Sequence, residues 1–443
     1  MTNLPDLDLC TDGAAMQAQL QAMLPGFADG SLRIDALGVS SVRRNTSQQR
    51  NPRRLTLCYD LAVHEPVSGR RGVQWLYAEV FRDDVDAVAS AARQRGPLTP
   101  PAFGEPLVHL PHLRMLLWAL PNDPGLPQLS TLLDPVRAAA VVPGAGSAGV
   151  RIELLRYAPE QRATLRYTLP GRAGAAPSQV YAKTFRDGRA GAIAARFRHF
   201  WQAARGDATA PLVAEPLGCD EGLRTVWQAP AAGVPLRDTL GEADAPRWMA
   251  GVARALARLH AAPLAPTATA TPRSVAHWVD EVDRRRRKIA RIDAALAPRA
   301  QHIAETLRAH APRHLQRPMS LIHGDWHLDQ VWVQGDRLLL FDFDEFTLGD
   351  PMEDLAEFVL KLEQLERHDL RAARGSALAS VLIAHYRAAA PQRFDAAALA
   401  WHLAIQSLLQ ASRAFIYQQP DWQRTLERRL AACEVRTAAL RDL

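Results

Sequence analysis

A segment rich in acidic residues, LIHGDWHLDQVWVQGDRLLLFDFDEFTLGDP at positions 321–351, carries residue types suited to phosphoryl transfer. Within it, Asp325 and Gln330 lie five positions apart, and the Gly-Asp dipeptide at 335–336 predicts a β-hairpin directly after them. Asp342 falls at the end of the second strand of that hairpin. We therefore expect a loop, a hairpin and a strand end to bring these three side chains together.

Such a group of side chains matches what the transfer of a phosphoryl group to a hydroxyl requires. One carboxylate must accept or orient the proton of the attacking hydroxyl, while a second carboxylate and an amide oxygen can hold Mg²⁺ against the phosphates. Other interpretations remain open. Asp325 and Asp342 could be acids of surface turns, and His327 and Asp329 could ligate the metal of a hydrolase.

The spacing H-G-D-x-x-x-x-N/Q, then a hairpin, then D-F-x-x-x-x-x-G-D-P-x-x-D-L-A resembles the aminoglycoside phosphotransferase and choline kinase-like family, relatives of the protein kinases. The matching residues are His323-Gly324-Asp325, Gln330, Asp342-Phe343, Gly349-Asp350-Pro351 and Asp354-Leu355-Ala356. The resemblance covers roughly residues 150–443. The first part of the motif is also similar to that of maltokinase-like sugar kinases, which carry a domain ahead of the kinase.

This resemblance implies a two-lobed, protein-kinase-like fold with ATP in the cleft. It makes Asp325 the catalytic base and Asp342 the principal metal ligand, with the amide of Gln330 as the second metal and nucleotide contact where most members have asparagine. We expect His323 to orient the loop. We expect Asp350 and Asp354 to cap or brace the helix that follows.

Lys183, in the apolar stretch YAKTF, is a further candidate for nucleotide binding. Only three of the 53 lysine and arginine residues of the chain are lysines, so a lysine inside an apolar strand indicates a specific use. The resemblance places Lys183 at the family's ATP-contacting lysine. Kinases pair that lysine with a glutamate of the next helix, but the helix expected at 188–205 contains no acid, which leaves Glu215 as an alternative partner.

An internal repeat precedes the kinase-like segment. Five matches keep the same order: LRIDAL (32–37) with VRIELL (150–155), RLTLCYDL (54–61) with RATLRYTL (162–169), LYAEVFRD (76–83) with VYAKTFRD (180–187), GEPL (104–107) with AEPL (214–217), and Trp118 with Trp227. We interpret them as a duplicated β-rich unit whose first copy has diverged. Glu79 stands where the second copy has Lys183, so we expect the first copy to bind no nucleotide.

The length of 443 residues favours two or three domains. The expected class is α+β, with a diverged N-terminal cap domain at 1–140, a kinase N-lobe at 141–235 and a helical kinase C-lobe with the catalytic loop at 236–443. Four distant cysteines indicate a reduced, cytoplasmic protein without a disulfide framework. A net charge of +6 permits anionic ligands, and we expect a small-molecule substrate with neither a nucleic-acid nor a membrane partner.

The predicted function is an ATP- and Mg²⁺-dependent phosphotransferase that phosphorylates a hydroxyl of a small molecule, such as a sugar, an aminosugar or a related metabolite. The alternative is a nucleotide-binding pseudokinase or scaffold, which the missing helix acid favours and the intact Asp325, Asp342 and Lys183 oppose. A protein kinase is disfavoured because no activation-loop segment separates Asp342 from the Gly-Asp-Pro motif.

Overall fold

The computed structural model describes residues 7–44, 53–82, 85–94, 96–146, 149–171, 177–207, 210–240, 243–262, 271–366 and 375–442. The chain forms two compact units. The first unit comprises Met1–Ala190, Cys219–Trp227 and Phe415–Pro420, and the second comprises Gly191–Gly218, Gln228–Ala414 and Asp421–Leu443. These units divide the chain differently from the expected boundaries after residues 140 and 235, because the two β-rich segments share a core.

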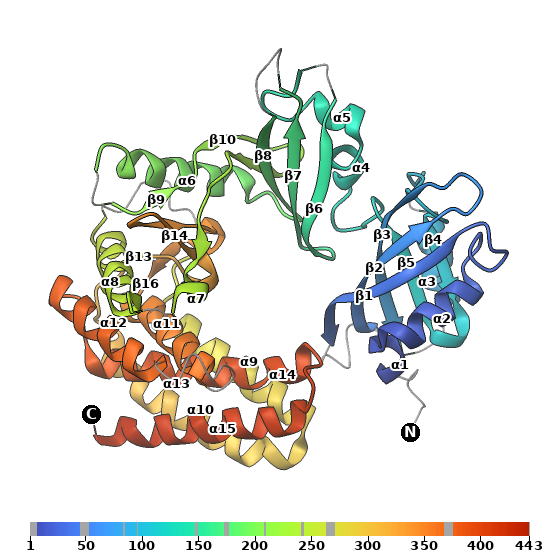
Figure 1. The fold of residues 1–443 in the computed structure, drawn as a ribbon. Coiled ribbons are helices and arrows are strands. Elements are labelled where there is room, and N and C mark those ends of the chain that lie inside the picture. The colour runs from blue at the N-terminus through green and yellow to red at the C-terminus, as the bar shows by residue number, and fades with distance from the viewer. Residues whose placement is uncertain are drawn as a thin grey trace. The chain divides into compact units, whose positions relative to one another are not determined.

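Two five-stranded sheets dominate the first unit (Figure 1). The first sheet contains β1 (Arg33–Arg44), β2 (Arg53–His64), β3 (Arg71–Phe81), β4 (Leu107–Leu110) and β5 (Met115–Ala119). The second contains β6 (Arg151–Ala158), β7 (Arg162–Leu169), β8 (Ser178–Phe185), β10 (Pro216–Asp220) and β11 (Thr225–Gln228). The helices are α1 (Leu7–Thr11), α2 (Gly13–Met23), α3 (Asp86–Arg93), α4 (Leu129–Leu132) and α5 (Pro135–Ala139), with a 3₁₀ turn at Pro111–Leu113.

The two sheets have the same strand order, which supports the predicted duplication. The first runs β1-β2-β3-β5-β4 and the second β6-β7-β8-β11-β10. Their registers also agree, since Thr56 pairs with Glu79 across β2 and β3, and Thr164 pairs with Lys183 across β7 and β8. Glu79 and Lys183 therefore occupy corresponding positions on corresponding strands.

In each copy, an arginine with a left-handed backbone directly precedes the strand that comes last in the sequence, β5 or β11. Arg114 and Arg224 have left-handed φ values of 49° and 50°. The carbonyl of each accepts the backbone N–H of the phenylalanine that ends β3 or β8, at 3.0 and 3.1 Å. Each guanidinium also donates to the carbonyl of the residue after that phenylalanine. The copies thus share a detailed local geometry as well as a strand order.

The same geometry corrects one of the five sequence matches. Counting from the two arginines, the third residue of the first copy is Leu117, and the third residue of the second copy is Trp227. Trp227 therefore corresponds to Leu117, and the match with Trp118 was displaced by one residue. A one-residue shift in a strand moves a side chain to the opposite face of the sheet.

The face of the first sheet that carries Glu79 is covered by a hydrophobic core. Tyr77 lies two residues from Glu79 on β3, so both side chains share that face. Tyr77 is fully buried, and Glu79 is 4% exposed and accepts a 2.9 Å hydrogen bond from Nε1 of Trp118. In the second sheet, by contrast, the face of Lys183 is half-exposed.

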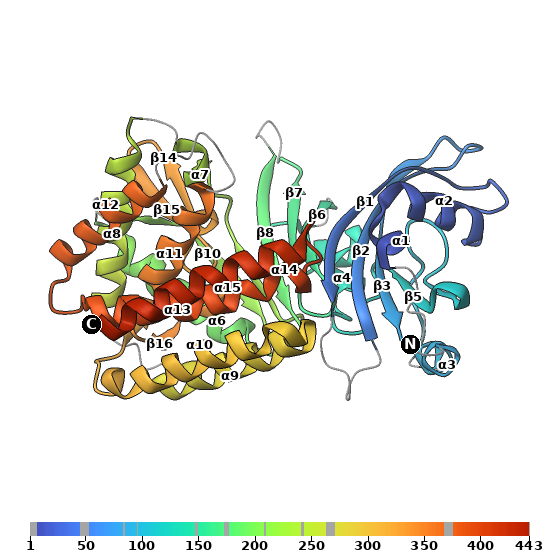
Figure 2. The same cartoon turned by 90° about the horizontal axis from the view of Figure 1, so that it is seen from below.

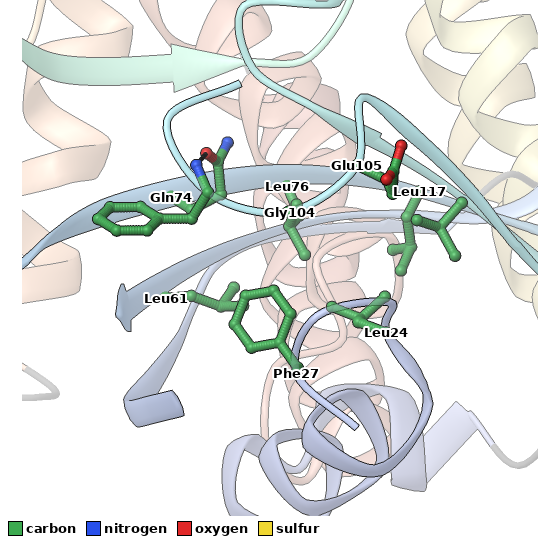
Figure 3. Close-up of a pocket in the computed structure, with 10 residues that line it drawn as sticks. Leu24, Phe27, Leu61, Gln74, Leu76, Gly104, Glu105 and Leu117 are labelled. Carbon is green, nitrogen blue, oxygen red and sulfur yellow. Dashed lines mark hydrogen bonds between the residues drawn. The ribbon is translucent and has the colours of Figure 1, made fainter. Parts of the chain in front are cut away.

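One core includes side chains of both sheets, and a second core covers the other face of the first sheet alone. The shared core contains Cys58, Tyr77 and Trp118 from the first sheet and Leu165, Tyr167 and Ala182 from the second. In the second core, Figure 3 shows a cavity between β2, β3, β5 and the loop after α2, with Leu24, Phe27, Leu61 and Leu76 at its edge. Its volume of about 10 Å³ is the space of about one water molecule. The cavity is therefore far too small for a nucleotide.

The second unit is mainly helical. Its helices are α6 (Ala190–Ala204), α7 (Leu236–Thr239), α8 (Ala245–Ala261), α9 (Val275–Ile292), α10 (Ala297–His310), α11 (Pro351–Glu366), α12 (Gly375–Ala389), α13 (Ala396–Ala411), α14 (Arg413–Ile416) and α15 (Trp422–Ala439). Figure 2 shows α9, α10, α13 and α15 side by side, and their apolar faces form a common core. No helix in the described ranges is long and apolar enough to cross a membrane.

Two small sheets in this unit carry the acidic segment. One has the order β12-β14-β15-β9 and the other is the pair β13-β16. The bounds of their strands are β9 (Leu212–Val213), β12 (Val234–Pro235), β13 (Ser320–Ile322), β14 (Val331–Gln334), β15 (Arg337–Leu340) and β16 (Thr347–Gly349). Helices and sheets together confirm the predicted α+β class.

Candidate active site

The predicted hairpin after Gln330 is confirmed. Strands β14 and β15 pair antiparallel around the two-residue turn at 335–336, where Gly335 has a φ of +61° that favours glycine. At the open end of the hairpin, the backbone N–H of Phe341 donates to the carbonyl of Gln330 at 2.9 Å. This extra bond continues the ladder by one step and sets Gln330 beside Asp342.

Asp342 has a backbone conformation that is uncommon for a residue with a side chain. Its φ of 61° and ψ of 68° lie in the left-handed region, just before a 3₁₀ turn at Phe343–Glu345. Such a conformation costs on the order of 1–2 kcal/mol, although aspartate tolerates it better than most residues. Here it directs the carboxylate back to the hairpin, with Oδ2 3.2 Å from the amide of Gln330.

The surroundings of the Gln330 amide fit a bound cation. Asp329 donates its backbone N–H to Nδ1 of His327 at 3.2 Å, so a neutral His327 carries its proton on Nε2 and needs an acceptor. The Gln330 amide lies 3.3 Å from that Nε2. In the structure Nε2 of Gln330 donates to Oδ2 of Asp342. Turning the amide by half a turn would exchange this bond for one from His327 and would set two oxygens, from Gln330 and Asp342, side by side. A carboxylate and an amide oxygen suit Mg²⁺.

Asp325 lies near the same ring nitrogen of His327. Its Oδ2 is 3.7 Å from Nε2 of His327, and about a third of its side chain is exposed. Burial alone raises the pKa of Asp325, but the contact with His327 outweighs it and holds the pKa below its ordinary value. Asp325 is thus an ionised, accessible carboxylate at neutral pH. The structure brings the three predicted residues of this segment together, with Asp325 and Gln330 near His327 and Asp342 in contact with Gln330.

The backbone of the catalytic loop is held by Asp354. Its two carboxylate oxygens accept the N–H groups of His323 and Gly324 at 2.7 and 2.8 Å, and His260 Nε2 lies 3.1 Å from one of them. Nε2 of His323 reaches the carbonyl of Phe341 at 3.0 Å. Asp354 and His323 are completely buried. His323 thus has the orienting role expected from the sequence. Asp354 was expected to cap or brace α11, but it lies within that helix and holds the catalytic loop instead.

Arg273, which was not predicted from the sequence, holds the same loop through the carbonyl of Gly324. Its guanidinium donates to the carbonyl of Gly324 at 2.7 Å, pairs with Glu345 at 3.2 Å and also pairs with the buried Glu353. Gly324 has a φ of +78°, and a Cβ there would lie 2.5 Å from the carbonyl oxygen of Glu345. Only glycine fits this close approach before Asp325.

Asp350 begins α11, as expected. Its Oδ1 accepts the N–H of Met352 at 2.9 Å, and its carboxylate pairs with Arg317 at 2.5 Å. Burial raises the pKa of Asp350, but His402 and Arg317 together hold it far below the ordinary value. The carboxylate therefore stays charged and stabilises the start of the helix that carries Asp354.

Two charged residues of α11 that sequence reasoning missed lie in the electrostatic environment of Asp325. Burial and the charge of Asp325 raise the pKa of Glu357 to about 7, while Arg413 and Lys361 oppose the rise. Burial and Arg413 lower the pKa of Lys361. The scarcity of lysine was a signal for Lys361, which is one of only three in the chain.

Glu357→Gln is expected to flatten the pH dependence of stability. Protonated Glu357 contributes stability that is complete below its unfolded pKa of about 4.5 and is lost as pH rises through about 7. Glutamine has no proton to lose. Urea unfolding at about pH 5 and about pH 8 should therefore show a wild-type loss on the order of 2–3 kcal/mol that the variant lacks. Glu363→Gln, half-exposed on the same helix, serves as the control, and equal slopes for wild type and Glu357→Gln would contradict this account.

Lys183 lies on β8, in the first compact unit. Its ammonium group is 5.9 Å from the centre of the Phe185 ring. The side chain stands on the half-exposed face of the second sheet, opposite the face that enters the shared core. This placement leaves one face of Lys183's sheet available to a ligand. In the ranges that the structure describes, no group of three or more His, Cys, Asp or Glu is arranged to hold a metal.

A family comparison agrees with this arrangement. Residues 172–402, more than half of the chain, match the model of the phosphotransferase enzyme family, APH. The chain belongs to the phosphotransferase enzyme family. Membership confirms the predicted resemblance and the predicted enzyme class of small-molecule kinase. The matched range includes Lys183 and the whole acidic segment. A comparison with curated proteins gave no match.

Solved structures of phosphotransferases and choline kinases show a distant likeness to the chain. A choline kinase from Cryptosporidium parvum is 10% identical, with a TM-score of 0.47, and the alignment covers 69% of this chain and 94% of that one. A thermostable mutant of the aminoglycoside phosphotransferase APH(4)-Ia is 16% identical, with a TM-score of 0.46 and coverage of 66% and 95%. APH(3'')-Id from Streptomyces rimosus is 18% identical, with a TM-score of 0.43 and coverage of 63% and 98%.

Proposed function

We propose that this phosphotransferase moves the γ-phosphoryl group of ATP, with Mg²⁺, to a hydroxyl of a small molecule. The observation that carries the proposal is the arrangement around His327. The ionised carboxylate of Asp325 and the amide of Gln330 lie near the same ring nitrogen of His327, and Gln330 in turn contacts the carboxylate of Asp342. Phosphoryl transfer needs a proton acceptor and a metal site next to each other, because the attacking hydroxyl must reach a phosphate that the metal holds.

In this proposal each side chain has a separate task. Asp325 accepts or orients the proton of the acceptor hydroxyl, whose oxygen forms a bond to the γ-phosphorus while the bond from that phosphorus to the bridging oxygen of ADP breaks. Asp342 and Gln330 hold Mg²⁺, which when bound compensates for the negative charge of the phosphates. Lys183 contacts the phosphates of the nucleotide. Asp354 and Arg273 keep the backbone on both sides of Gly324 fixed, so that Asp325 is oriented before the substrate binds.

The acceptor in this proposal is a sugar, an aminosugar or a related hydroxylated metabolite. The local similarity to maltokinase-like sugar kinases at residues 323–330 and the extra N-terminal domain support it. An ionised Asp325 whose side chain is about one third exposed is also compatible with a polar acceptor that presents several hydroxyl groups. A panel of monosaccharides, aminosugars, aminoglycosides and amino alcohols, assayed by ATP consumption, tests this assignment.

A pseudokinase remains the second candidate, because the sequence of α6 contains no aspartate or glutamate to pair with the nucleotide lysine. Thermal-shift measurements with ATP, with and without Mg²⁺, separate the two functions when they are followed by the acceptor panel. An enzyme should be stabilised by Mg²⁺-ATP and should consume ATP with at least one acceptor. Stabilisation without any turnover over the whole panel would favour the pseudokinase. No stabilisation by any nucleotide would contradict both.

The first copy of the repeat is expected to bind no nucleotide. Glu79, which occupies the position that corresponds to Lys183, is buried and hydrogen-bonded to Trp118. Lys183→Ala should weaken Mg²⁺-ATP binding, measured by titration calorimetry, while Glu79→Ala should leave it unchanged. Glu79→Ala should instead lower the free energy of unfolding by about 1–3 kcal/mol, since the Trp118 N–H loses a buried acceptor. An equal loss of ATP affinity in both variants would contradict the inactive-copy prediction.

A further inference from the structure

A buried carboxylate joins the first copy of the repeat to the first hairpin of the second. Asp123, which follows β5, is only 3% exposed. One of its oxygens accepts the N–H of Gly125 at 2.7 Å. The other accepts the hydroxyl of Tyr157 at 2.7 Å and the N–H of Glu160 at 2.8 Å. Tyr157 and Glu160 belong to the end of β6 and to the turn between β6 and β7.

The two segments also approach each other closely at the backbone. A Cβ on Gly125 would lie 2.5 Å from Cα of Glu160, so no larger residue fits there. Glu160 itself has a φ of 56°, in the left-handed region. A residue other than glycine needs support from its surroundings to stay in a left-handed conformation. The hydrogen bond from the N–H of Glu160 to Asp123 supplies part of that support. Contacts with Asp123 and Gly125 of the first copy thus fix the conformation of the turn.

This turn lies at the same end of its sheet as Lys183. Arg162, the first residue after the turn, pairs with Phe185, and the pair two residues further along is Thr164 with Lys183. In addition, the carbonyl of Gln161 in the turn accepts the N–H of the residue after Phe185 at 2.9 Å. The turn and Lys183 are therefore close to each other at one end of the sheet.

We propose that Asp123 is a positioning residue for nucleotide binding, which holds the turn between β6 and β7 in the conformation that receives the nucleotide phosphates. The inference rests on the proposed function. Kinases cover the phosphates with a glycine-rich loop in the corresponding first hairpin, but the turn here, APEQ at 158–161, has no glycine. Its conformation is set from outside by Asp123. The first copy thus contributes to nucleotide binding without binding the nucleotide.

Asp123→Asn changes this contact with little change in shape. If the amide oxygen keeps the bond to Gly125, the new NH₂ group faces the N–H of Glu160, and two donors then meet. The turn should be released from its fixed conformation, and nucleotide binding would have to restore it at a cost in affinity. Asp134→Asn is the matched control. Asp134 lies in the same connecting segment and accepts two backbone N–H groups at 2.9 Å, but it caps α5.

The experiment measures two properties of the full chain. Hydrogen exchange reports the protection of the Glu160 amide, and titration calorimetry with Mg²⁺-ATP reports nucleotide affinity. For Asp123→Asn we expect faster exchange at Glu160, an ATP affinity about tenfold weaker, a raised KM for ATP and a kcat near that of wild type. Asp134→Asn should match wild type in both measurements. Tyr157→Phe, which removes only one of the three donors, should weaken ATP binding about two- to threefold.

The outcomes separate this inference from the proposed function. Wild-type ATP affinity in Asp123→Asn, with faster exchange or a lower Tm, would show a purely structural contact and would overturn the inference alone. If Asp123→Asn does not fold, Tyr157→Phe decides, and wild-type ATP affinity in that variant would overturn the inference. A wild-type protein that binds no nucleotide would overturn the proposed function and this inference with it.

Discussion

Asp325→Asn should lower kcat about 10²–10⁴-fold while leaving Mg²⁺-ATP binding nearly unchanged. Asparagine has almost the same shape, so the loop that Asp354 and Arg273 hold should keep its conformation. It cannot accept the proton of the acceptor hydroxyl, however, and its amide offers no negative charge to orient that proton. Steady-state turnover with the best acceptor of the panel measures the loss.

Asp336→Asn is a suitable control for this experiment, because Asp336 is an exposed acid at the tip of the hairpin after the same loop. It should keep wild-type turnover. Calorimetry on Asp325→Asn should give an ATP affinity close to that of wild type. A variant that retains more than about a third of wild-type turnover would remove Asp325 from the mechanism.

Asp342→Ala should lower activity at a fixed millimolar Mg²⁺ concentration by about 100-fold or more. A carboxylate contributes a full charge to a hard cation, and metal contacts of this kind supply several kcal/mol to the reaction. Gln330→Ala should cost less, about tenfold, since an amide contributes only a dipole. Mg²⁺ titrations at saturating ATP give the apparent metal affinity of each variant.

Raising the Mg²⁺ concentration should partly restore both variants, because weaker metal binding can be offset by mass action. Asp342→Asn is a useful third variant, since it keeps the shape of the side chain and one oxygen but loses the charge. It should fall between Gln330→Ala and Asp342→Ala. If added Mg²⁺ changes the activity of none of these variants, the assignment of Asp342 and Gln330 as metal ligands is wrong.

The parts of this site that depend on residues close together in the sequence could be predicted from it. The hairpin and its turn were visible because apolar runs flank a Gly-Asp dipeptide, and the hairpin brings the backbones of Gln330 and Asp342 close together. The left-handed backbone that directs the Asp342 carboxylate was not predicted. The repeat was visible because short strand segments of the two copies have similar sequences in the same order. The strand registers of Glu79 and Lys183 follow from local matches. The tryptophan match was displaced by one residue, although the turns before the last strands, from Leu110 to Arg114 and from Asp220 to Arg224, have equal length.

The contacts that fix the catalytic loop could not be predicted. Arg273 and Gly324 are 51 positions apart, and His260 and Asp354 are 94 apart. No spacing or periodicity in the sequence connects such pairs, since they meet only when the helices pack. The role of Asp123 was hidden in the same way. It lies in a Pro- and Gly-rich connection whose composition suggests only a loop.

The most direct test of the account is ³¹P nuclear magnetic resonance of a reaction with Mg²⁺-ATP and the best acceptor of the panel. We expect a new phosphate monoester signal that grows with the signals of ADP and is absent with Asp325→Asn. ADP that accumulates with inorganic phosphate alone, or a monoester that Asp325→Asn forms as fast as wild type, would contradict transfer to a hydroxyl through Asp325.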